Sequence, residues 1–259
     1  MLIFFDLDGT LITEGTHFMP ESTREAIAAA RKNGHICVVN TGRTKKLVGP
    51  DVHKLAEFDA FLMGCGTMIT RGDSVLFHES FDAAESVEIM EALRNLKIDA
   101  VLEGSRNNYH DSVENIFYPT FKDFVRRFAD KSYGSFQEAV GNFDKLYAYA
   151  DDMETMKAFQ KQFIGRLDFV DRQKGFFEIM PTGCSKASAM KVLADSFGIP
   201  MSQTAALGDS TNDIPMLQCA EYGIAMGNSS ESVKAAADYV TTALEEDGVW
   251  NALNWLGVL

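Results

Sequence analysis

Residues 5–10 read FDLDGT, and the apolar run LIFF at residues 2–5 leads directly into them. An apolar run with aromatic and β-branched residues predicts a strand that is buried on both faces. Residues i and i+2 of a strand point to one face, so Asp6 and Asp8 would share a crevice if the strand continued, and Gly9 allows a sharp turn. Two carboxylates about 4 Å apart repel by roughly 4 kcal/mol at an effective dielectric constant near 20, so the pair favours a cation or a shared proton.

A purely structural interpretation competes with this one. Asp-Gly is a common turn signal, so Asp8 and Gly9 alone predict a turn, with Asp6 as a capping residue. The four fixed residues of Asp-x-Asp-Gly-Thr should occur by chance in roughly one chain of this size per several hundred. The strand in front and the matching segments downstream therefore favour a functional interpretation.

Composition is that of an ordinary globular protein. The chain has 259 residues, 46% hydrophobic and 24% charged, with a formal net charge of −13. An acidic surface attracts neither nucleic acid nor anionic membranes, so neither is an expected partner. The four cysteines and five histidines show no metal-ligand spacing, which favours reduced thiols and a cytoplasmic protein without zinc or disulfides. No leader peptide or membrane span is expected, and we expect a monomer or weak oligomer.

Strands and helices are predicted to alternate at both ends of the chain. Near the N-terminus the predicted elements are a strand at 2–5, a helix at 20–33, a strand at 36–39, a helix at 44–57 and a strand at 60–63. Near the C-terminus they are a helix at 186–197, strands at 204–207 and 223–226, a helix at 231–237, a strand at 239–241 and a helix at 249–256. This order implies right-handed crossovers, so both ends are predicted to form one α/β layer with a doubly wound, mostly parallel, Rossmann-like sheet.

The middle of the chain has a different pattern. Its predicted elements are a helix at 82–96, strands at 100–103 and 108–112, a helix at 120–129, a strand at 145–150, a helix at 153–165, and a hairpin that pairs 167–172 with 176–180. An α+β insert of about a hundred residues is large enough to fold as its own lobe. We therefore expect a core made of residues 1–80 and 183–259 and an inserted α+β domain at 81–182.

Further polar segments follow the predicted strands. The segments TGR (41–43) and GDSTND (208–213) each stand directly after a strand, where open parallel sheets bind ligands. Thr41 and Gly42 offer a hydroxyl and a bare amide to an anion, and Arg43 adds either a charge-assisted contact or a surface ion pair. Lys186 is expected in the first turn of its helix, where the helix dipole disfavours a cation unless an anion lies near.

The acids of the segment 208–213 also have two interpretations. Asp209 and Asp213 are suitable caps for the short helix that is expected to end near Cys219. If their loop meets the Asp6 loop, at least three carboxylates converge with Lys186 alone to offset them. Mg²⁺ is the fitting cation in that case, because it binds a few carboxylates and keeps waters and a phosphate oxygen as its other ligands.

This set of motifs, with an insert between the second and third, resembles the haloacid dehalogenase-like phosphatases, and the insert is similar to the α+β (type IIB) cap of the Cof-type branch. The resemblance covers nearly the whole chain, including the tail segments 225–228 and 247–249. Two positions depart from the family pattern. Residues 65–67 read Cys-Gly-Thr where the family usually shows Asn-Gly-Ala, and Ala187 replaces a common glycine.

The resemblance implies a phosphatase that works through an aspartyl-phosphate intermediate. Asp6 would be the nucleophile, and Asp8 would protonate the leaving oxygen and then deprotonate water. Mg²⁺ would be held by the carboxylates of Asp6 and Asp209 and the backbone carbonyl of Asp8, with Asp213 as a ligand or support. The phosphoryl oxygens would be held by the catalytic residues Thr41 and Lys186 together with the Gly42 amide and Asn212. The substrate-binding residues would be Gly9, Gly42, Arg43 and Asn212.

The insert would act as a lid that carries the selectivity residues. The candidates are Glu103, Arg106, Asn107, Asn108, Tyr109 and Glu178. The expected substrate is a small phosphorylated metabolite, with sugar phosphates before cofactor phosphates. Two alternatives stay open: a sugar phosphomutase that uses the same site, and a non-catalytic module that binds phosphorylated metabolites.

Overall fold

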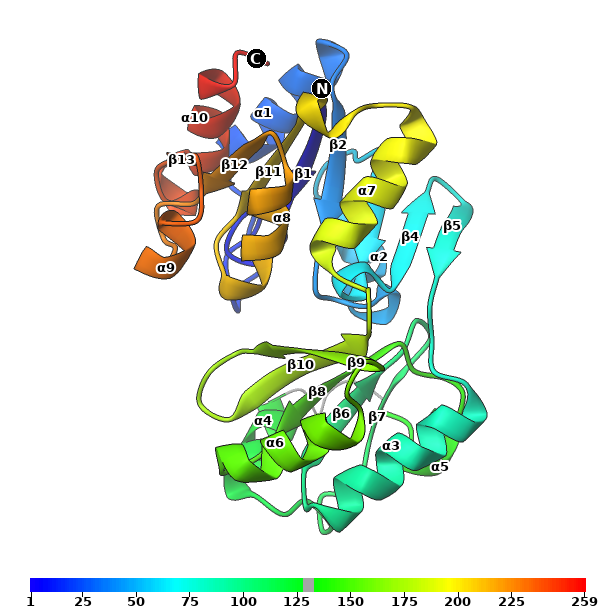
Figure 1. The fold of residues 1–259 in the computed structure, drawn as a ribbon. Coiled ribbons are helices and arrows are strands. Elements are labelled where there is room, and N and C mark those ends of the chain that lie inside the picture. The colour runs from blue at the N-terminus through cyan, green and yellow to red at the C-terminus, as the bar shows by residue number, and fades with distance from the viewer. Residues whose placement is uncertain (128–132) are drawn as a thin grey trace. The chain divides into compact units, whose positions relative to one another are not determined.

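The chain folds into two compact units in the computed structural model, which describes residues 1–127 and 133–259 (Figure 1). Unit 1 comprises Met1–Arg43, Val48–Phe77 and Ser185–Leu259, and unit 2 comprises Thr44–Leu47 and His78–Cys184. The assignment of residues 1–80 and 183–259 as a catalytic core and of 81–182 as a cap stays a prediction. Among the described residues, none of the helices combines the length and apolarity that a bilayer crossing requires.

Unit 1 is built on an eight-stranded sheet with the order β13-β12-β11-β1-β2-β3-β4-β5. The strands are β1 (Leu2–Phe5), β2 (Ile36–Asn40), β3 (Ala60–Met63), β4 (Met68–Arg71), β5 (Ser74–His78), β11 (Thr204–Gly208), β12 (Tyr222–Ala225) and β13 (Tyr239–Val240). β1 is central and parallel to both neighbours, with Phe5 opposite Leu207 of β11 and Val39 of β2. The predicted doubly wound, mostly parallel sheet is confirmed.

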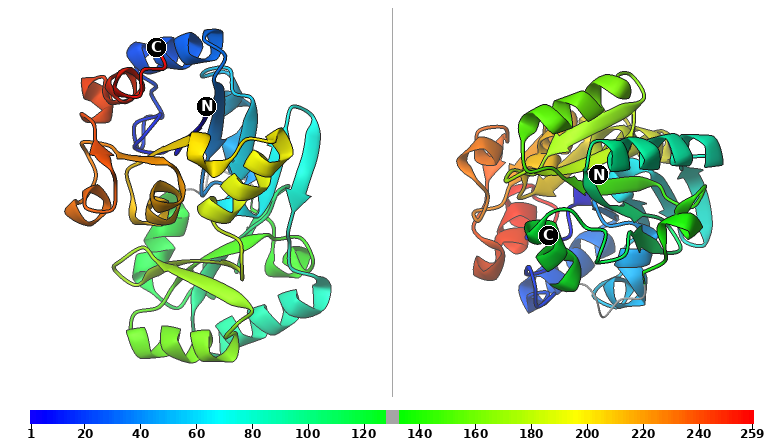
Figure 2. Two further views of the ribbon diagram at one scale, coloured as in Figure 1. Left: turned by 45° about the horizontal axis from the view of Figure 1, so that its top comes forward. Right: turned by 90° about the horizontal axis from the view of Figure 1, so that it is seen from below.

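Helices cover both faces of this sheet, which explains why the first strand is apolar throughout. They are α1 (Glu21–Lys32), α2 (Lys45–His53), α7 (Lys186–Phe197), α8 (Ile214–Cys219), α9 (Glu231–Lys234) and α10 (Gly248–Trp255). α7 and α8 lie on one face of the sheet, and α1 and α10 lie side by side on the other (Figures 1 and 2). Ile3 and Phe5 pack toward α1 and α10. Leu2 and Phe4 pack toward α7 and α8. Each such side chain contributes about 1.5–3 kcal/mol on burial.

Two elements of unit 1 differ from the prediction. The helix expected at 44–57 ends at His53 and is interrupted at Gly49, whose φ is 55° and ψ 179°. The interruption precedes Pro50, which has no N–H to donate and restricts the residue before it. The strands β4 and β5 were not predicted: β4 pairs antiparallel with β3, and Gly72 turns the chain between β4 and β5. The other predicted elements of unit 1 are present, with ends shifted by a few residues.

Unit 2 is an α+β unit with a five-stranded antiparallel sheet of order β7-β6-β8-β10-β9. Its elements are α3 (Ala83–Asn95), β6 (Asp99–Glu103), β7 (Asn108–His110), α4 (Pro119–Arg127), α5 (Phe136–Ala139), β8 (Lys145–Tyr149), α6 (Met153–Gln162), β9 (Leu167–Asp171) and β10 (Phe176–Pro181). The predicted hairpin is confirmed as β9–β10. The short α5 was not predicted, and the expected helix end at 128–129 lies outside the described residues.

Candidate active site

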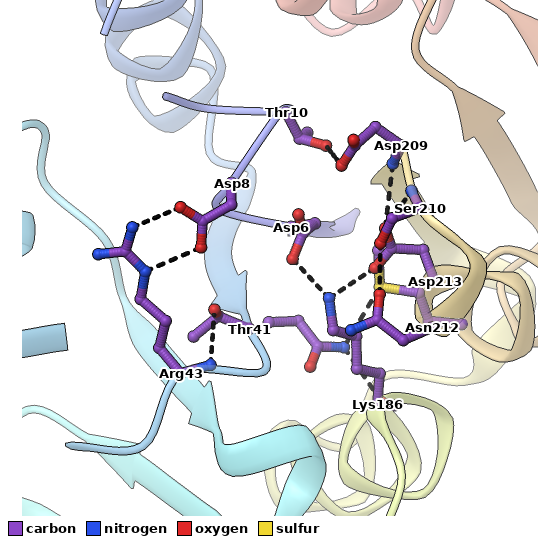
Figure 3. Close-up of polar contacts among 12 residues, drawn as sticks. Asp6, Asp8, Thr10, Thr41, Arg43, Lys186, Asp209, Ser210, Asn212 and Asp213 are labelled. Carbon is purple, nitrogen blue, oxygen red and sulfur yellow. Dashed lines mark hydrogen bonds and ion pairs between the residues drawn. The ribbon is translucent and has the colours of Figure 1, made fainter. Parts of the chain in front are cut away.

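Three neighbouring strands deliver the polar segments to one edge of the unit 1 sheet. Asp6 follows β1, Thr41 follows β2, and Asp209 follows β11. The strands are parallel neighbours, so their carboxyl ends meet at the same edge. The Asp6 amide also donates to the Leu207 carbonyl at 2.9 Å, which extends the β1–β11 pairing up to the site. The sequence segments that were predicted to meet therefore do so (Figure 3).

Lys186 lies at the centre of the site. Its ammonium donates to Asp6 Oδ1 and to Asp213 Oδ1, each at 2.5 Å. All three side chains are buried, with exposed fractions of 1%, 7% and 0% for Lys186, Asp6 and Asp213. Lys186 is the first residue of α7 and directly follows the N-cap residue Ser185. The two carboxylates are the compensating anions that a cation at a helix N-terminus requires, as predicted.

Three carboxylates gather around this lysine. Asp6, Asp209 and Asp213 each offer an oxygen, and these oxygens lie within 4.8 Å of one another. Burial, with the Asp213 charge adding to it, raises the pKa of Asp6 well above its usual range although Lys186 opposes the shift. Burial and Asp213 likewise raise the pKa of Asp209 to about 7. Hard oxygen donors with an excess of negative charge are the set that Mg²⁺ prefers, so these residues fit the expected ion.

Asp213 also shapes the loop on which it lies. Its Oδ2 accepts hydrogen bonds from the backbone amides of Asp209 and Ser210 at 3.0 and 2.9 Å. It makes no side-chain capping bond to α8, but it completes a capping box with Ser210 at the 3₁₀ turn Thr211–Asp213, which runs directly into α8. Asn212 lies in the same loop and accepts from Ser210 Oγ at 2.6 Å. Sequence reasoning assigned no role to Ser210, although it stands inside the segment that was singled out.

The Asp8 carboxylate lies apart from this group. Arg43 Nε donates to Asp8 Oδ2 at 2.8 Å and Arg43 Nη2 donates to Asp8 Oδ1, which makes a bidentate ion pair. Figure 3 shows the Asp8 side chain turned toward Arg43 and away from Asp209. β1 ends at Phe5, so the alternation expected for a continued strand does not extend to Asp8. Of the two roles weighed for Arg43, the structure shows an ion pair, with the Arg43 side chain only 18% exposed.

Thr41 and Gly42 lie in the turn that precedes α2. Thr41 is buried, and its hydroxyl oxygen accepts from the Arg43 amide at 3.1 Å. The Thr41 amide in turn donates to the Leu62 carbonyl at 2.8 Å. These bonds hold the Thr41 side chain at the end of β2, beside Asp6.

Gly9 makes room for Asp209. Its φ is +82°, and a Cβ on Gly9 would lie 2.3 Å from Asp209 Oδ2. Thr10 Oγ1 donates to the other Asp209 oxygen at 3.3 Å, a contact that sequence reasoning missed although Thr10 belongs to the quoted motif. The tail residue Asn228 joins the same turn, because its Nδ2 donates to the Gly9 carbonyl at 2.9 Å. The chain therefore needs glycine at position 9, because any side chain there would collide with the Asp209 carboxylate.

Two of the selectivity candidates form a buried cluster inside unit 2. Lys145 Nζ lies 2.6 Å from Glu178 Oε1 and 3.2 Å from Glu103 Oε2. Asn108 and Tyr109 are also buried. These contacts give the two glutamates a structural role within the sheet of unit 2, and their part in selectivity stays a prediction.

Gly66 allows the N-terminus of α7 to approach the 3₁₀ turn Gly64–Gly66, which follows β3, and this leads to a testable prediction. Gly66 has φ +94°, and a Cβ there would lie 2.3 Å from the Ser185 carbonyl oxygen. Gly15 has φ +81° with nothing within 4 Å of the same position. Alanine at φ > 0 costs about 1–2 kcal/mol at either site, and the clash should add about 1–3 kcal/mol at Gly66.

Urea unfolding of Gly66→Ala and Gly15→Ala measures this difference. We expect the stability loss of Gly66→Ala to exceed that of the Gly15→Ala control by about 1–3 kcal/mol. Equal losses in the two variants would show that the contact with Ser185 relaxes without cost.

Comparisons with known proteins agree on one family. Residues 3–253 match the family model described as haloacid dehalogenase-like hydrolase. The putative phosphatase YkrA of Bacillus subtilis is 28% identical over 275 residues, which cover 100% of this chain and 98% of YkrA. The 5-amino-6-(5-phospho-D-ribitylamino)uracil phosphatase YcsE of the same organism is 26% identical, with 98% of this chain and 95% of YcsE covered.

Solved structures show the same relationship. The subclass IIB sugar phosphatase BT4131 superposes with a TM-score of 0.83 at 27% identity, covering 100% of this chain and 99% of BT4131. The phosphatase BT1666 of Bacteroides thetaiotaomicron superposes with a TM-score of 0.87 at 26% identity, covering 100% of this chain and 95% of BT1666.

Proposed function

This chain belongs to the haloacid dehalogenase-like hydrolases, and on that premise we propose that it is a magnesium-dependent phosphatase of small phosphorylated metabolites, with sugar phosphates as the leading substrate class. Phosphatases among its relatives, including the sugar phosphatase BT4131, support a phosphoric monoester hydrolase. The observation that carries the proposal is the buried Lys186 between Asp6 and Asp213, with Asp209 beside them. We further propose that unit 2 is the cap domain of this family.

In the proposed reaction, Asp6 attacks the phosphorus atom. A bond forms between an Asp6 oxygen and phosphorus, and the bond from phosphorus to the leaving oxygen breaks. Asp8 leaves its ion pair with Arg43 and takes up a proton when substrate binds, then gives that proton to the leaving oxygen and later takes a proton from the water that attacks the aspartyl phosphate. Inorganic phosphate leaves, and the Asp6 carboxylate and the Asp8 proton are restored. Both carboxylates therefore end the cycle as they began it.

Lys186 supplies positive charge to this reaction. Two of its three N–H groups bond Asp6 and Asp213, which leaves one, within the described part of the chain, for a phosphoryl oxygen. Thr41 and the Gly42 amide are proposed to bind the other phosphoryl oxygens with Asn212. Mg²⁺, held by Asp6, Asp209 and the Asp8 carbonyl with support from Asp213, would neutralise the charge of the phosphoryl group.

A phosphate-release assay with a panel of phosphate esters tests the proposal. We expect release from sugar phosphates with Mg²⁺, loss of release in EDTA, and recovery when Mg²⁺ is restored, because the carboxylate group has an excess of negative charge. No release from any ester would contradict the proposal. An isomerised sugar phosphate would indicate the phosphomutase, and tight binding without turnover the non-catalytic module. Cytoplasmic location and a monomeric or weakly oligomeric state stay predictions.

A further inference from the structure

Asn40 is a polar residue in an apolar place. It is the last residue of β2, the last four residues of which are buried, and Asn40 itself is 0% exposed. It directly precedes Thr41 at the site edge of the sheet. Burying an amide costs free energy unless its polar atoms find hydrogen-bond partners. The contacts of this one side chain therefore need an explanation.

The Asn40 amide nitrogen ties β2 to two helices. Asn40 Nδ2 donates to the backbone oxygen of Lys186 at 3.1 Å and contacts Met216 Sδ at 3.5 Å. Lys186 is the first residue of α7, and Met216 lies in α8, three residues after Asp213. Asn40 thus lies behind the Lys186–Asp213 ion pair and holds the backbone of its cation.

The amide oxygen of Asn40 makes no stabilising contact of its own among the described residues. Asn40 Oδ1 is buried and has no hydrogen-bond partner within the described residues. An unsatisfied buried acceptor costs about 1–3 kcal/mol, and an apolar side chain of similar size avoids that cost. Leucine at this position would remove that cost and lose the Nδ2 bond, worth about 0.5–1.5 kcal/mol, so the two changes offset and stability does not explain the amide. What the amide does supply is the bond to Lys186.

We infer that Asn40 is a positioning residue for phosphoryl transfer, which acts by holding the first turn of α7 so that Lys186 stays between Asp6 and Asp213. The inference rests on the proposed function, since it concerns the same lysine. Lys186 acts on charge that develops during transfer, so a misplaced ammonium should lower kcat more than it raises KM. A displacement of about 1 Å costs on the order of 10²-fold in rate.

Asn40→Leu is the decisive variant. We expect its free energy of unfolding in urea to stay within about 1 kcal/mol of the wild-type value, while kcat falls by about 10- to 100-fold. KM should stay within about two-fold, and inhibition by orthovanadate, which adopts five-coordinate geometry, should weaken in parallel with kcat. Wild-type kcat in Asn40→Leu overturns the inference. If kcat falls and the free energy of unfolding falls by several kcal/mol as well, the inference is also overturned, because that result indicates a structural role.

One further variant separates the hydrogen bond from packing. Met216→Leu removes the sulfur and keeps the apolar volume, so it should retain wild-type kcat. A loss as large as in Asn40→Leu would assign the effect to packing and equally overturn the inference.

A readout without turnover keeps this test independent of the proposed function. In protein labelled with ¹⁵N-lysine, the buried Lys186 ammonium should give a slowly exchanging NMR signal, assigned by its loss in Lys186→Met. We expect that signal to shift or broaden in Asn40→Leu and to stay unchanged in Met216→Leu. An unchanged signal in Asn40→Leu overturns the inference even if the wild type releases no phosphate. An inactive wild type with a shifted signal would refute the proposed function alone.

Discussion

Asp6→Asn is expected to lower kcat/KM by at least about 10⁴-fold and to leave the protein folded. The amide keeps the shape of the side chain but cannot form the proposed phosphoryl bond. Burial already raises the pKa of Asp6, so the ionised carboxylate is costly here, and Asp213 still pairs with Lys186 in the variant. The free energy of unfolding should therefore change by less than about 1 kcal/mol. Phosphate release and urea unfolding measure the two effects.

The matched control is Asp73→Asn, the same chemical change at an exposed position between β4 and β5. It should leave both activity and stability unchanged. Intact-mass spectrometry confirms that the introduced asparagine has not deamidated to aspartate during purification. If pure Asp6→Asn protein retains more than a trace of turnover, another residue is the nucleophile.

Lys186→Met is expected to destabilise the fold and to abolish most activity. The substitution leaves the buried Asp6 and Asp213 carboxylates without their shared cation. Removing one partner of a buried ion pair costs about 3–5 kcal/mol. Loss of a preorganised positive charge should also lower kcat by about 10²- to 10³-fold. Urea unfolding in EDTA and phosphate release with Mg²⁺ measure the two losses, and Lys191→Met, exposed on the same helix, is the control.

A second substitution tests the cause of the instability. Asp213→Asn removes one of the uncompensated charges, so the double variant Lys186→Met/Asp213→Asn should be more stable than Lys186→Met alone, yet no more active. Additive losses would show that charge balance is not what Lys186 supplies.

The stability loss in Lys186→Met should also depend on pH. The pKa of Asp6 is raised in the folded protein, and Lys186 opposes that rise, so the variant should raise it further. A folded protein with a raised carboxyl pKa binds more protons than the unfolded chain. Both proteins should lose the same Asp6 contribution between about pH 4, the ordinary aspartate value, and the raised wild-type pKa. The stability of the variant relative to the wild type should therefore fall only as pH rises from the wild-type folded pKa of Asp6 toward the higher folded pKa of the variant, and below the wild-type folded pKa the Asp6 contribution to the difference should disappear. A pH-independent difference would contradict this explanation.

Local pattern and general electrostatics were enough for much of the fold and of the site. The apolar run at 2–5 predicted a strand that is buried on both faces. The structure agrees, because Leu2 and Phe4 face one helix layer and Ile3 and Phe5 face the other. The position of Lys186 at the start of its helix required nearby anions, and Asp6 and Asp213 supply them. Both inferences depend on neighbours in sequence or on charge, which the chain displays directly.

Other features came only from packing between distant segments. The direction of Asp8 depends on where β1 ends and on Arg43, 35 residues away. The need for glycine at position 66 appears only when the Ser185 backbone is in place. The β4–β5 hairpin likewise extends the sheet beyond β3, and its turn at Gly72 can be recognised only once β4 is seen to pair with β3.

Periodicity, turn residues and charge act over a few residues, so they were sufficient to predict the order of strands and helices, the edge of the sheet at which the acids gather and the need for a cation among them. The pairing of particular side chains depends instead on packing between distant segments. Asn40 meets Lys186 across 146 residues and Met216 across 176, and such contacts depend on how helices seat on a sheet, which no local pattern encodes.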